Sequence, residues 1–329
     1  MSGRMHILIT GAAGMIGRKL TARLVRDGAL NGRTVDRMTL TDIIAPGKPA
    51  AALFPIATEA RDLAVPGAAA LAVAGRPDII FHLAAIVSGE AESDFEKGYR
   101  VNFAGTRELL EAIRLADSYH PKLVFASSIA VFGAPFPDAI GDEFFLTPLT
   151  SYGTQKAIGE LLLADYTRRG FLDGIGIRLP TIVVRPGKPN KAASGFFSSI
   201  IREPLAGQEA VLPVSDDVRH WFASPRAAVG FLVHAAALER DRIRVRVNLT
   251  MPGLCCTVGE EIAALARVAG ANVVKRIRRE PDEMVAQIVA GWPQNFDARR
   301  ATALGFRAET SFDDIIRAHI KDELGGRMV

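Results

Sequence analysis

The chain has 329 residues, of which 49% are hydrophobic and 23% are charged. This is the composition of a folded globular protein, and it excludes a disordered chain, a collagen-like repeat and a coiled coil. The net charge of +4 is small and evenly spread, which argues against a nucleic-acid partner. No apolar run approaches the ~20 residues that a membrane span requires, so we expect no membrane segment.

The cysteines and histidines do not form a metal site in the sequence. Cys255 and Cys256 are adjacent, too close for an ordinary structural disulfide and too few for a zinc site. The six histidines show no metal-binding spacing. Met1 leads directly into an apolar run without the parts of a secretory signal. We therefore expect a cytoplasmic protein without a metal centre.

Strand-like and amphipathic helical stretches alternate in the first half of the chain. We expect strands at His6–Thr10, Arg37–Asp42, Ile56–Thr58, Asp78–Leu83, Lys122–Ser127 and Gly174–Leu179. We expect helices at Met15–Asp27, Ala68–Ala74, Phe95–Asp117 and Ser151–Arg168. This alternation predicts an α/β fold with a doubly wound parallel sheet of the Rossmann type.

The regular alternation ends near Pro186, where Gly, Pro and Ser become frequent. We expect residues 1–186 to form a dinucleotide-binding domain and residues 187–223 and 250–329 to form a smaller C-terminal α/β substrate lobe. Residues 224–249 are expected to return to the main sheet. Arginine occupies every second position from Arg240 to Arg246, which predicts a strand with one solvated face. We also expect the short basic run at 275–279 to be solvated.

A glycine-rich turn, TGAAGMIG at 10–17, follows the first strand and opens the first helix. Gly11 permits the tight turn, Gly14 lets the backbone approach a pyrophosphate, and Gly17 permits close helix–sheet packing. The helix N-terminus offers free N–H groups to the phosphates. Asp42 ends the next strand, where a carboxylate accepts hydrogen bonds from ribose hydroxyls and repels a 2′-phosphate. The sequence therefore predicts an NAD site.

Tyr152 and Lys156 are four residues apart on a predicted helix and share one face. Ser128 ends the strand before them, at the sheet edge where ligands bind. Shifting a phenol pKa from about 10 to about 7 requires roughly 4 kcal/mol. An ammonium about 4 Å away, at an effective dielectric near 20, supplies roughly that energy. We therefore expect Tyr152 to act as a general base whose pKa Lys156 lowers.

Further motifs accompany these two: Asp62-Leu63, His82-Leu83-Ala84-Ala85, Val101-Asn102, Gly105-Thr106 and Ser127–Gly133. With them the chain resembles the extended short-chain dehydrogenase/reductase family, which contains nucleotide-sugar epimerases and dehydratases. The resemblance implies that Ser128, Tyr152 and Lys156 are catalytic and that Asn102 belongs to a proton relay. It implies cofactor contacts at Gly11, Gly14, Met15, Ile16, Gly17, Asp42, Asp62, Leu63, Leu83, Ala84, Ala85, Asn102, Tyr152, Lys156 and Pro180.

The resemblance also implies a homodimer that pairs the helices expected at Phe95–Asp117 and Ser151–Arg168. The apolar residues available for that seam are Leu109, Leu110, Ile113, Leu161 and Leu162. Core packing explains the same residues equally well.

The chain departs from the nucleotide-sugar enzymes of this family at three positions. Thr181 stands where an Asn is usual, without the following Gly-Pro; Phe132 replaces a Tyr; and His220 follows Arg219 where an Asp is common. These departures argue against a diphosphate-sugar substrate. The stretches 152–160, 178–187, 195–201 and 218–225 resemble instead a branch of the family that oxidises a small sugar acid.

We therefore expect NAD-dependent oxidation of a small anionic sugar acid, with Tyr152 as the base. Arg185 and Arg219 are the candidates for its carboxylate, because arginine binds planar anions in a fork. Ser88, Ser128 and Tyr152 complete the expected substrate contacts. One alternative is a nucleotide-sugar epimerase or dehydratase that keeps NAD tightly bound. Another is a dinucleotide sensor without chemistry, against which the intact Ser–Tyr–Lys set argues.

Other polar and aromatic residues have structural interpretations. We expect His82 to pack beneath the cofactor and Trp221 and Trp292 to lie in the core or a pocket wall. Asp142 and Glu143 are expected to serve in a loop or a helix cap.

Overall fold

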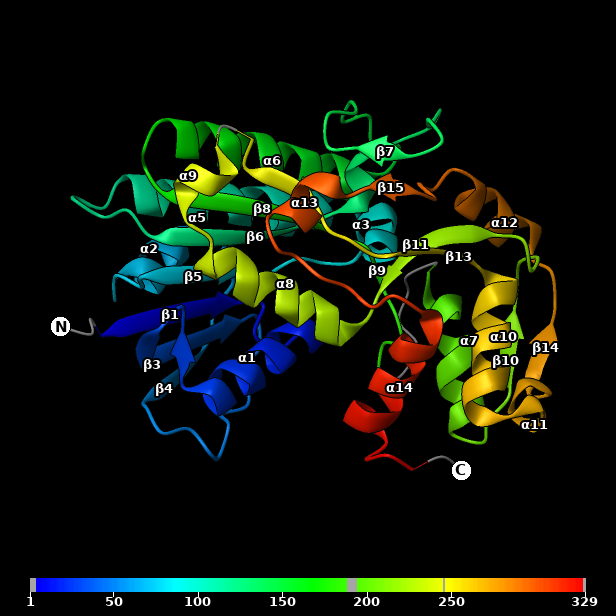
Figure 1. The fold of residues 1–329 in the computed structure, drawn as a ribbon. Coiled ribbons are helices and arrows are strands. Elements are labelled where there is room, and N and C mark those ends of the chain that lie inside the picture. The colour runs from blue at the N-terminus through cyan, green and yellow to red at the C-terminus, as the bar shows by residue number, and fades with distance from the viewer. Residues whose placement is uncertain (1–3, 188–193, 245, 328–329) are drawn as a thin grey trace.

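A twisted sheet forms the centre of the first part of the chain (Figure 1). The computed structural model describes residues 4–187, 194–244 and 246–327. In spatial order the sheet contains β12 (Asn248–Thr250), β8 (Asp173–Leu179), β6 (Lys122–Ser128), β5 (Ile79–His82), β1 (Met5–Thr10) and β3 (Arg33–Asp42). The outer side of β3 pairs with β4 (Ile56–Ala60) and with β2 (Ala29–Leu30). All these pairings are parallel except that of β2 with β3, which confirms the predicted doubly wound fold.

Helices cover both faces of this sheet, because alternate strand residues point to opposite sides. On one face lie α1 (Met15–Asp27) and α8 (Pro225–Ala237), whose apolar side chains pack against Ile7 and Ile9 of β1. On the other face lie α2 (Ala68–Val73), α5 (Gly105–Arg114) and α6 (Ser151–Arg168), packed against Leu8 and Phe125. The continuous apolar burial of β1 follows from this double cover.

The stretch expected as one helix from Phe95 to Asp117 is divided in the structure. It consists of α4 (Phe95–Gly98), a π-helical segment (Tyr99–Ala104) and α5. A short helix, α3 (Ser88–Ser93), precedes it, and a 3₁₀ turn (Ile129–Val131) follows β6. Asn102 lies within this π-helical segment, and such segments are frequent at functional sites.

The predicted strand over 240–247 is wrong. Residues Arg240–Ile243 form the helical turn α9, and the strand β12 begins only at Asn248. The alternating arginines are exposed because this segment connects α8 to the sheet across the surface. Val245 lies outside the described residues.

A second apolar core lies in the lower right part of Figure 1. Its mixed sheet contains β9 (Thr181–Ile182), β11 (Arg219–Ala223) and β13 (Leu254–Thr257), and a parallel pair contains β10 (Ala210–Leu212) and β14 (Ile277–Arg279). The helices around it are α7 (Gly195–Leu205), α10 (Val258–Ala269), α11 (Ala271–Val274), α12 (Glu283–Ala290) and α14 (Phe312–Glu323). The basic run at 275–279, which we expected to be solvated, contains β14, in which Arg278 and Arg279 are exposed and Ile277 is buried.

The C-terminal part of the chain also contacts the first core. The helix α13 (Arg299–Ala303) contacts β12, and Ala301 and Phe306 belong to the first apolar core. The strand β15 (Phe296–Asp297) pairs with β7 (Ile140–Gly141) of the first half. Residues 296–306 therefore join the two parts of the molecule instead of lying wholly in the second. Among the described residues, no helix combines the length and apolar character of a bilayer span.

Candidate active site

The cleft between the carboxyl ends of the main sheet and the second core has a volume of about 480 Å³, which suits a small-molecule site. The glycine turn after β1 lines this cleft, and so do Ser128, Tyr152 and Lys156 from the middle of the chain. Residues from the second core line it as well: Arg185, Ser194, Arg202, His220 and Trp292. The cleft therefore brings together residues that are more than 250 positions apart in the sequence, from Gly11 to Trp292.

The glycine turn forms a cradle, and a different constraint explains the glycine at each of its three positions. Gly11 has φ +73°, and a Cβ there would lie 2.6 Å from the backbone nitrogen of Ala84. A Cβ on Gly17 would collide with the carbonyl oxygen of Gly11. At Gly14 a Cβ would meet only that same carbonyl, at 3.2 Å, so this backbone borders the open cleft. The geometry fits a dinucleotide pyrophosphate at the N-terminus of α1.

Asp42 lies directly beside this cradle. Its carboxylate accepts hydrogen bonds from the backbone N–H of Ala13 at 2.9 Å and of Ile43 at 2.7 Å. The carboxylate therefore stabilises the glycine turn and places a negative charge next to it. This position agrees with the expected contact to the adenosine ribose.

The other expected cofactor residues divide into two groups. Met15, Ile16, Leu83, Ala85 and Pro180 line the cleft. Ala84 packs against the core beneath the cradle, Leu63 is buried, and the Asp62 carboxylate pairs with Arg100 and caps the Ala64 amide at 3.0 Å. His82 lies beneath the cradle as expected, between Thr10 at 2.8 Å and Thr106 at 2.9 Å.

Asn102 is buried within the π-helical turn and does not line the cleft directly. Its side-chain oxygen accepts from the Ile86 N–H at 2.9 Å, and its amide donates to Oε1 of Gln155 at 2.8 Å. Ile86 and Ser88 line the cleft, so Asn102 connects the catalytic helix α6 to the cleft wall. Gln155 was not among the predicted residues, because a glutamine in a helix carries no signal of its own.

Burial dominates the pKa values of Tyr152 and Lys156, the candidate catalytic pair. It raises the pKa of Tyr152 to about 12, and the hydrogen bond with Ser128 opposes this only in part. It lowers the pKa of Lys156 to about 8, against the effect of the Glu160 charge. The Lys156 ammonium donates to the Ala126 carbonyl at 2.8 Å and lies 5.7 Å from the Tyr152 ring centroid. The expectation that Lys156 by itself lowers the Tyr152 pKa is wrong, because both groups lose hydration and the ammonium binds a carbonyl.

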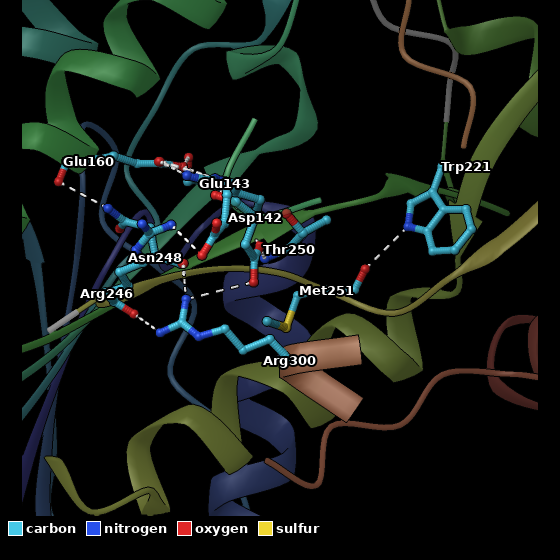
Figure 2. A network of polar contacts seen from close by, with 11 residues as sticks. Asp142, Glu143, Glu160, Trp221, Arg246, Asn248, Thr250, Met251 and Arg300 are labelled. Atoms are coloured by element: carbon cyan, nitrogen blue, oxygen red, sulfur yellow. Dashed lines mark hydrogen bonds and ion pairs between the residues drawn. The ribbon is translucent and has the colours of Figure 1, made fainter. Parts of the chain in front are cut away.

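A buried ionic network includes Glu160 of α6, the helix that also carries Tyr152 and Lys156 (Figure 2). The Glu160 carboxylate accepts from Ser127 at 2.6 Å and from Nη2 of Arg178 at 2.7 Å. Arg178 also lies 3.5 Å from Asp142, whose carboxylate accepts the Thr250 N–H at 2.7 Å. The network fixes α6, the helix that carries Tyr152 and Lys156, to β6, the strand that ends at Ser128, and to the neighbouring β8.

Asp142 and Glu143 have different environments within this network. Asp142 lies in a loop as expected, but its side chain is 5% exposed and faces Arg178 and, at 3.7 Å, Arg300. Glu143 is exposed and pairs with Arg246 at 2.9 Å. Neither carboxylate lines the cleft, so they do not form an acid–base pair with substrate.

The two candidate arginines for a substrate carboxylate lie in different places. Arg185 is half-buried and lines the cleft, with its guanidinium 3.2 Å from the Ser194 hydroxyl. Arg219 is exposed, does not line the cleft, and contacts the Cys255 sulfur at 3.8 Å. A second cleft arginine, Arg202, was not predicted; it donates to the Arg185 carbonyl at 2.6 Å and pairs with Glu203. A single arginine in a helix, such as Arg202, gives no indication in the sequence that it lines a cleft.

Both tryptophans are where the sequence placed them. Trp221 is 7% exposed in an apolar cluster, and its indole N–H donates to the Met251 carbonyl at 3.2 Å (Figure 2). Trp292 lines the cleft. Among the described residues, no group of three or more His, Cys, Asp or Glu side chains is arranged to hold a metal ion.

Comparison with known proteins places this geometry among nicotinamide enzymes. The model of the NAD dependent epimerase/dehydratase family matches residues 7–245. D-erythronate dehydrogenase of Cupriavidus necator is 47% identical over 322 residues, covering 97% of this chain and 98% of that protein. D-erythronate dehydrogenase of Haemophilus influenzae is 41% identical over 324 residues, covering 97% and 100% respectively.

Solved structures give the same fold. A structure described as the nucleoside-diphosphate-sugar epimerase from Agrobacterium tumefaciens is 62% identical, with a TM-score of 0.97, and covers 99% of this chain and 96% of its own. The L-threonine dehydrogenase of Cupriavidus necator is 22% identical, with a TM-score of 0.83, and covers 96% and 99%. At that identity the second likeness concerns the fold alone.

Proposed function

Because this chain belongs to the NAD dependent epimerase/dehydratase family, we propose that it oxidises D-erythronate to 2-dehydro-D-erythronate with NAD. The observation that carries the proposal is the joint position of Tyr152, Ser128 and Arg185 on one cleft that begins at the glycine cradle. The first two residues suit proton removal from an alcohol, and the third supplies the cation that a carboxylate requires. The two relatives named D-erythronate dehydrogenase support the choice of acid.

In the proposed reaction the Tyr152 oxygen takes up the hydroxyl proton while the alcohol carbon becomes a carbonyl. Bound NAD supplies the hydride acceptor and the positive charge of its oxidised ring. Ser128 holds the reacting oxygen, and Lys156 stabilises the phenolate form of Tyr152. Since burial raises the pKa of Tyr152 to about 12, the protein requires a further positive charge beside the phenol for efficient proton removal. The oxidised ring of bound NAD would supply that charge.

A nucleotide-sugar epimerase is the second candidate, favoured by the description of the 62% identical structure. Two residues argue against it. Thr181 and the buried His220 occupy positions where Asn and Asp are usual in the nucleotide-sugar enzymes that the sequence resembles, so the side chains usual at these positions are absent. Arg219, which would serve a phosphate there, lies outside the cleft. A sensor without chemistry leaves the Ser128–Tyr152–Lys156 arrangement unexplained.

We also propose a homodimer in the cytoplasm. Leu109, Leu110 and Ile113 are buried in the core of the single chain, so they are not available for a seam. Exposed apolar residues remain on the same helices, among them Leu161 at 64% exposure and Phe95 at 60%. These support a dimer through α4 and α6, which sedimentation would test.

The experiment is to incubate the purified protein with excess NAD and a panel of sugar acids and nucleotide sugars, and to follow NADH. We expect stoichiometric NADH with D-erythronate and a product with the mass of 2-dehydro-D-erythronate. Conversion of a nucleotide sugar to its epimer without net NADH would favour the epimerase. No reaction with any acid would overturn the proposal.

A further inference from the structure

Thr181 and His220 form a hydrogen-bonded pair in the wall of the cleft. Thr181 lies on β9 and His220 on β11, which are neighbouring parallel strands. The Thr181 hydroxyl oxygen is 2.6 Å from Nε2 of His220, and both residues line the cleft. Arg185, four residues after Thr181 in the chain, lines the same cleft.

The imidazole of His220 is held in one orientation by aromatic rings. It stacks on Phe197, with ring centroids 5.3 Å apart and an interplanar angle of 3°. Trp292 lies 5.5 Å away, and Phe222 meets the ring edge-on at 5.4 Å. The side chain is 2% exposed. Because the ring cannot turn, its two nitrogens have fixed neighbours.

The Thr181 hydroxyl is the ring's hydrogen-bond partner. Burial lowers the pKa of His220 to about 4, so the imidazole is neutral at physiological pH. Its Nδ1 is buried without a hydrogen-bond partner among the described residues, so Nε2 makes the hydrogen bond, to Thr181. In either tautomer of the neutral ring, the Thr181 hydroxyl uses one hydrogen-bonding position on Nε2 and keeps another.

We infer that Thr181 and His220 form a subsite that accepts a hydrogen bond from a second hydroxyl of the substrate, one that is not oxidised. Because one hydrogen-bonding position of the Thr181 hydroxyl is used by His220, its oxygen offers a lone pair to the cleft in either tautomer. An acceptor of this kind suits a hydroxyl and disfavours an anionic oxygen. The inference rests on the proposed function and refines it: the enzyme selects polyhydroxy acids over simple 2-hydroxy acids.

The test compares two four-carbon acids that share the carboxylate and the 2-hydroxyl. D-erythronate carries hydroxyls at C3 and C4, and D-2-hydroxybutanoate carries neither. We expect wild-type kcat/KM with NAD to be at least about 100-fold higher for D-erythronate, because a buried acceptor left unpaired by the deoxy acid is costly. Thr181→Val should reduce kcat/KM for D-erythronate about 30-fold or more and leave that for D-2-hydroxybutanoate within about threefold.

Two further variants distinguish a loss of the Thr181–His220 subsite from a general structural disturbance. Thr250→Val makes the same change at a buried hydroxyl on β12, outside the cleft, and should leave the ratio between the two acids unchanged. His220→Phe keeps an aromatic ring against Phe197 but removes the acceptor for Thr181, and should lower the ratio about tenfold. NAD affinity, measured by fluorescence, should stay within about threefold in all three variants.

The outcomes distinguish this inference from the proposed function. Oxidation of D-erythronate by the wild type, with both acids affected equally by Thr181→Val, overturns the subsite and leaves the proposed function standing. An unchanged ratio in His220→Phe removes His220 from the subsite. Oxidation of neither acid by the wild type overturns the proposed function and the subsite together.

Discussion

The two sides of the cleft are built in different ways. The cofactor side consists of backbone: Gly11, Gly14 and Gly17 shape it, and the Asp42 carboxylate fixes it through two amide hydrogen bonds. The substrate side consists of side chains from separate elements, such as Arg185 and His220. A backbone site serves any ligand with the same pyrophosphate, whereas a side-chain site changes with each substitution. The comparison explains how one family keeps its cofactor while its members differ in substrate.

The largest effect is expected where the two sides meet. Tyr152→Phe removes only the proton-accepting oxygen, so kcat should fall by about 10²–10⁴, the usual contribution of a general base. The NAD dissociation constant should change less than about threefold, because the cradle is intact. Steady-state kinetics and a fluorescence titration provide the two numbers. Retention of more than about a tenth of kcat would assign the base to another residue.

The substrate side should respond next. Arg185→Ala should raise KM for D-erythronate about 10- to 100-fold, since a hydrogen bond to a charged group contributes roughly 1.5–3 kcal/mol. Arg219→Ala is the matched control, because that arginine is exposed and outside the cleft. Its KM should remain within about twofold of the wild-type value. A larger increase in KM for Arg219→Ala than for Arg185→Ala would show that Arg219 binds the substrate carboxylate.

A change at Asp42 tests the cofactor side of the cleft. Asp42→Asn removes the negative charge and keeps an acceptor oxygen for one of the two amides, Ala13 or Ile43. The ratio of kcat/KM for NAD to that for NADP should fall about tenfold, as the repulsion of a 2′-phosphate is lost. Asp42→Ala should shift the ratio similarly and also weaken NAD binding. An unchanged ratio in both variants would place the discriminating group elsewhere.

Each side also contains a buried histidine that makes stability depend on pH. Burial lowers the pKa of His82 to about 3 and that of His220 to about 4. An unfolded histidine titrates near 6.5, so below that pH the unfolded chain binds protons that the folded chain does not. Stability is therefore full above about pH 6.5 and is lost as the pH falls towards 4.

The expected loss for each histidine between pH 7 and pH 5 is about 2 kcal/mol. Urea unfolding at the two pH values measures it. His220→Phe should reduce the pH dependence by about that amount, leaving the contribution of His82. An identical pH dependence in the wild type and the variant would show that the pKa of His220 is the same in the folded and unfolded protein.

The same contrast explains how much the sequence predicts. The glycine turn, Asp42 and the Tyr152–Lys156 spacing depend on contacts within short stretches, so their positions follow from local rules. The cleft contacts of Arg202 and the Gln155–Asn102 hydrogen bond depend on packing between distant elements and leave no local pattern. The arginine repeat at 240–246 led to the opposite error: a local pattern with a period of two predicted a strand that the structure does not contain.

The Tyr152 pKa shows a second kind of limit. Spacing places Lys156 on the correct face of α6, but it does not reveal the cost of burying both groups. That cost depends on how completely β6 and the cleft walls remove water. The direction of a pKa shift is therefore a property of the folded site and not of the motif.

The most direct test of the account is the ratio of wild-type kcat/KM for D-erythronate to that for erythritol, measured with NAD. The two compounds share the carbon chain and differ by the carboxylate that Arg185 is proposed to bind. We predict that the acid is favoured by at least about 30-fold, as the contribution of a charged hydrogen bond requires, and that Arg185→Ala removes most of the preference. Equal values for the acid and the tetritol in the wild type would contradict the account.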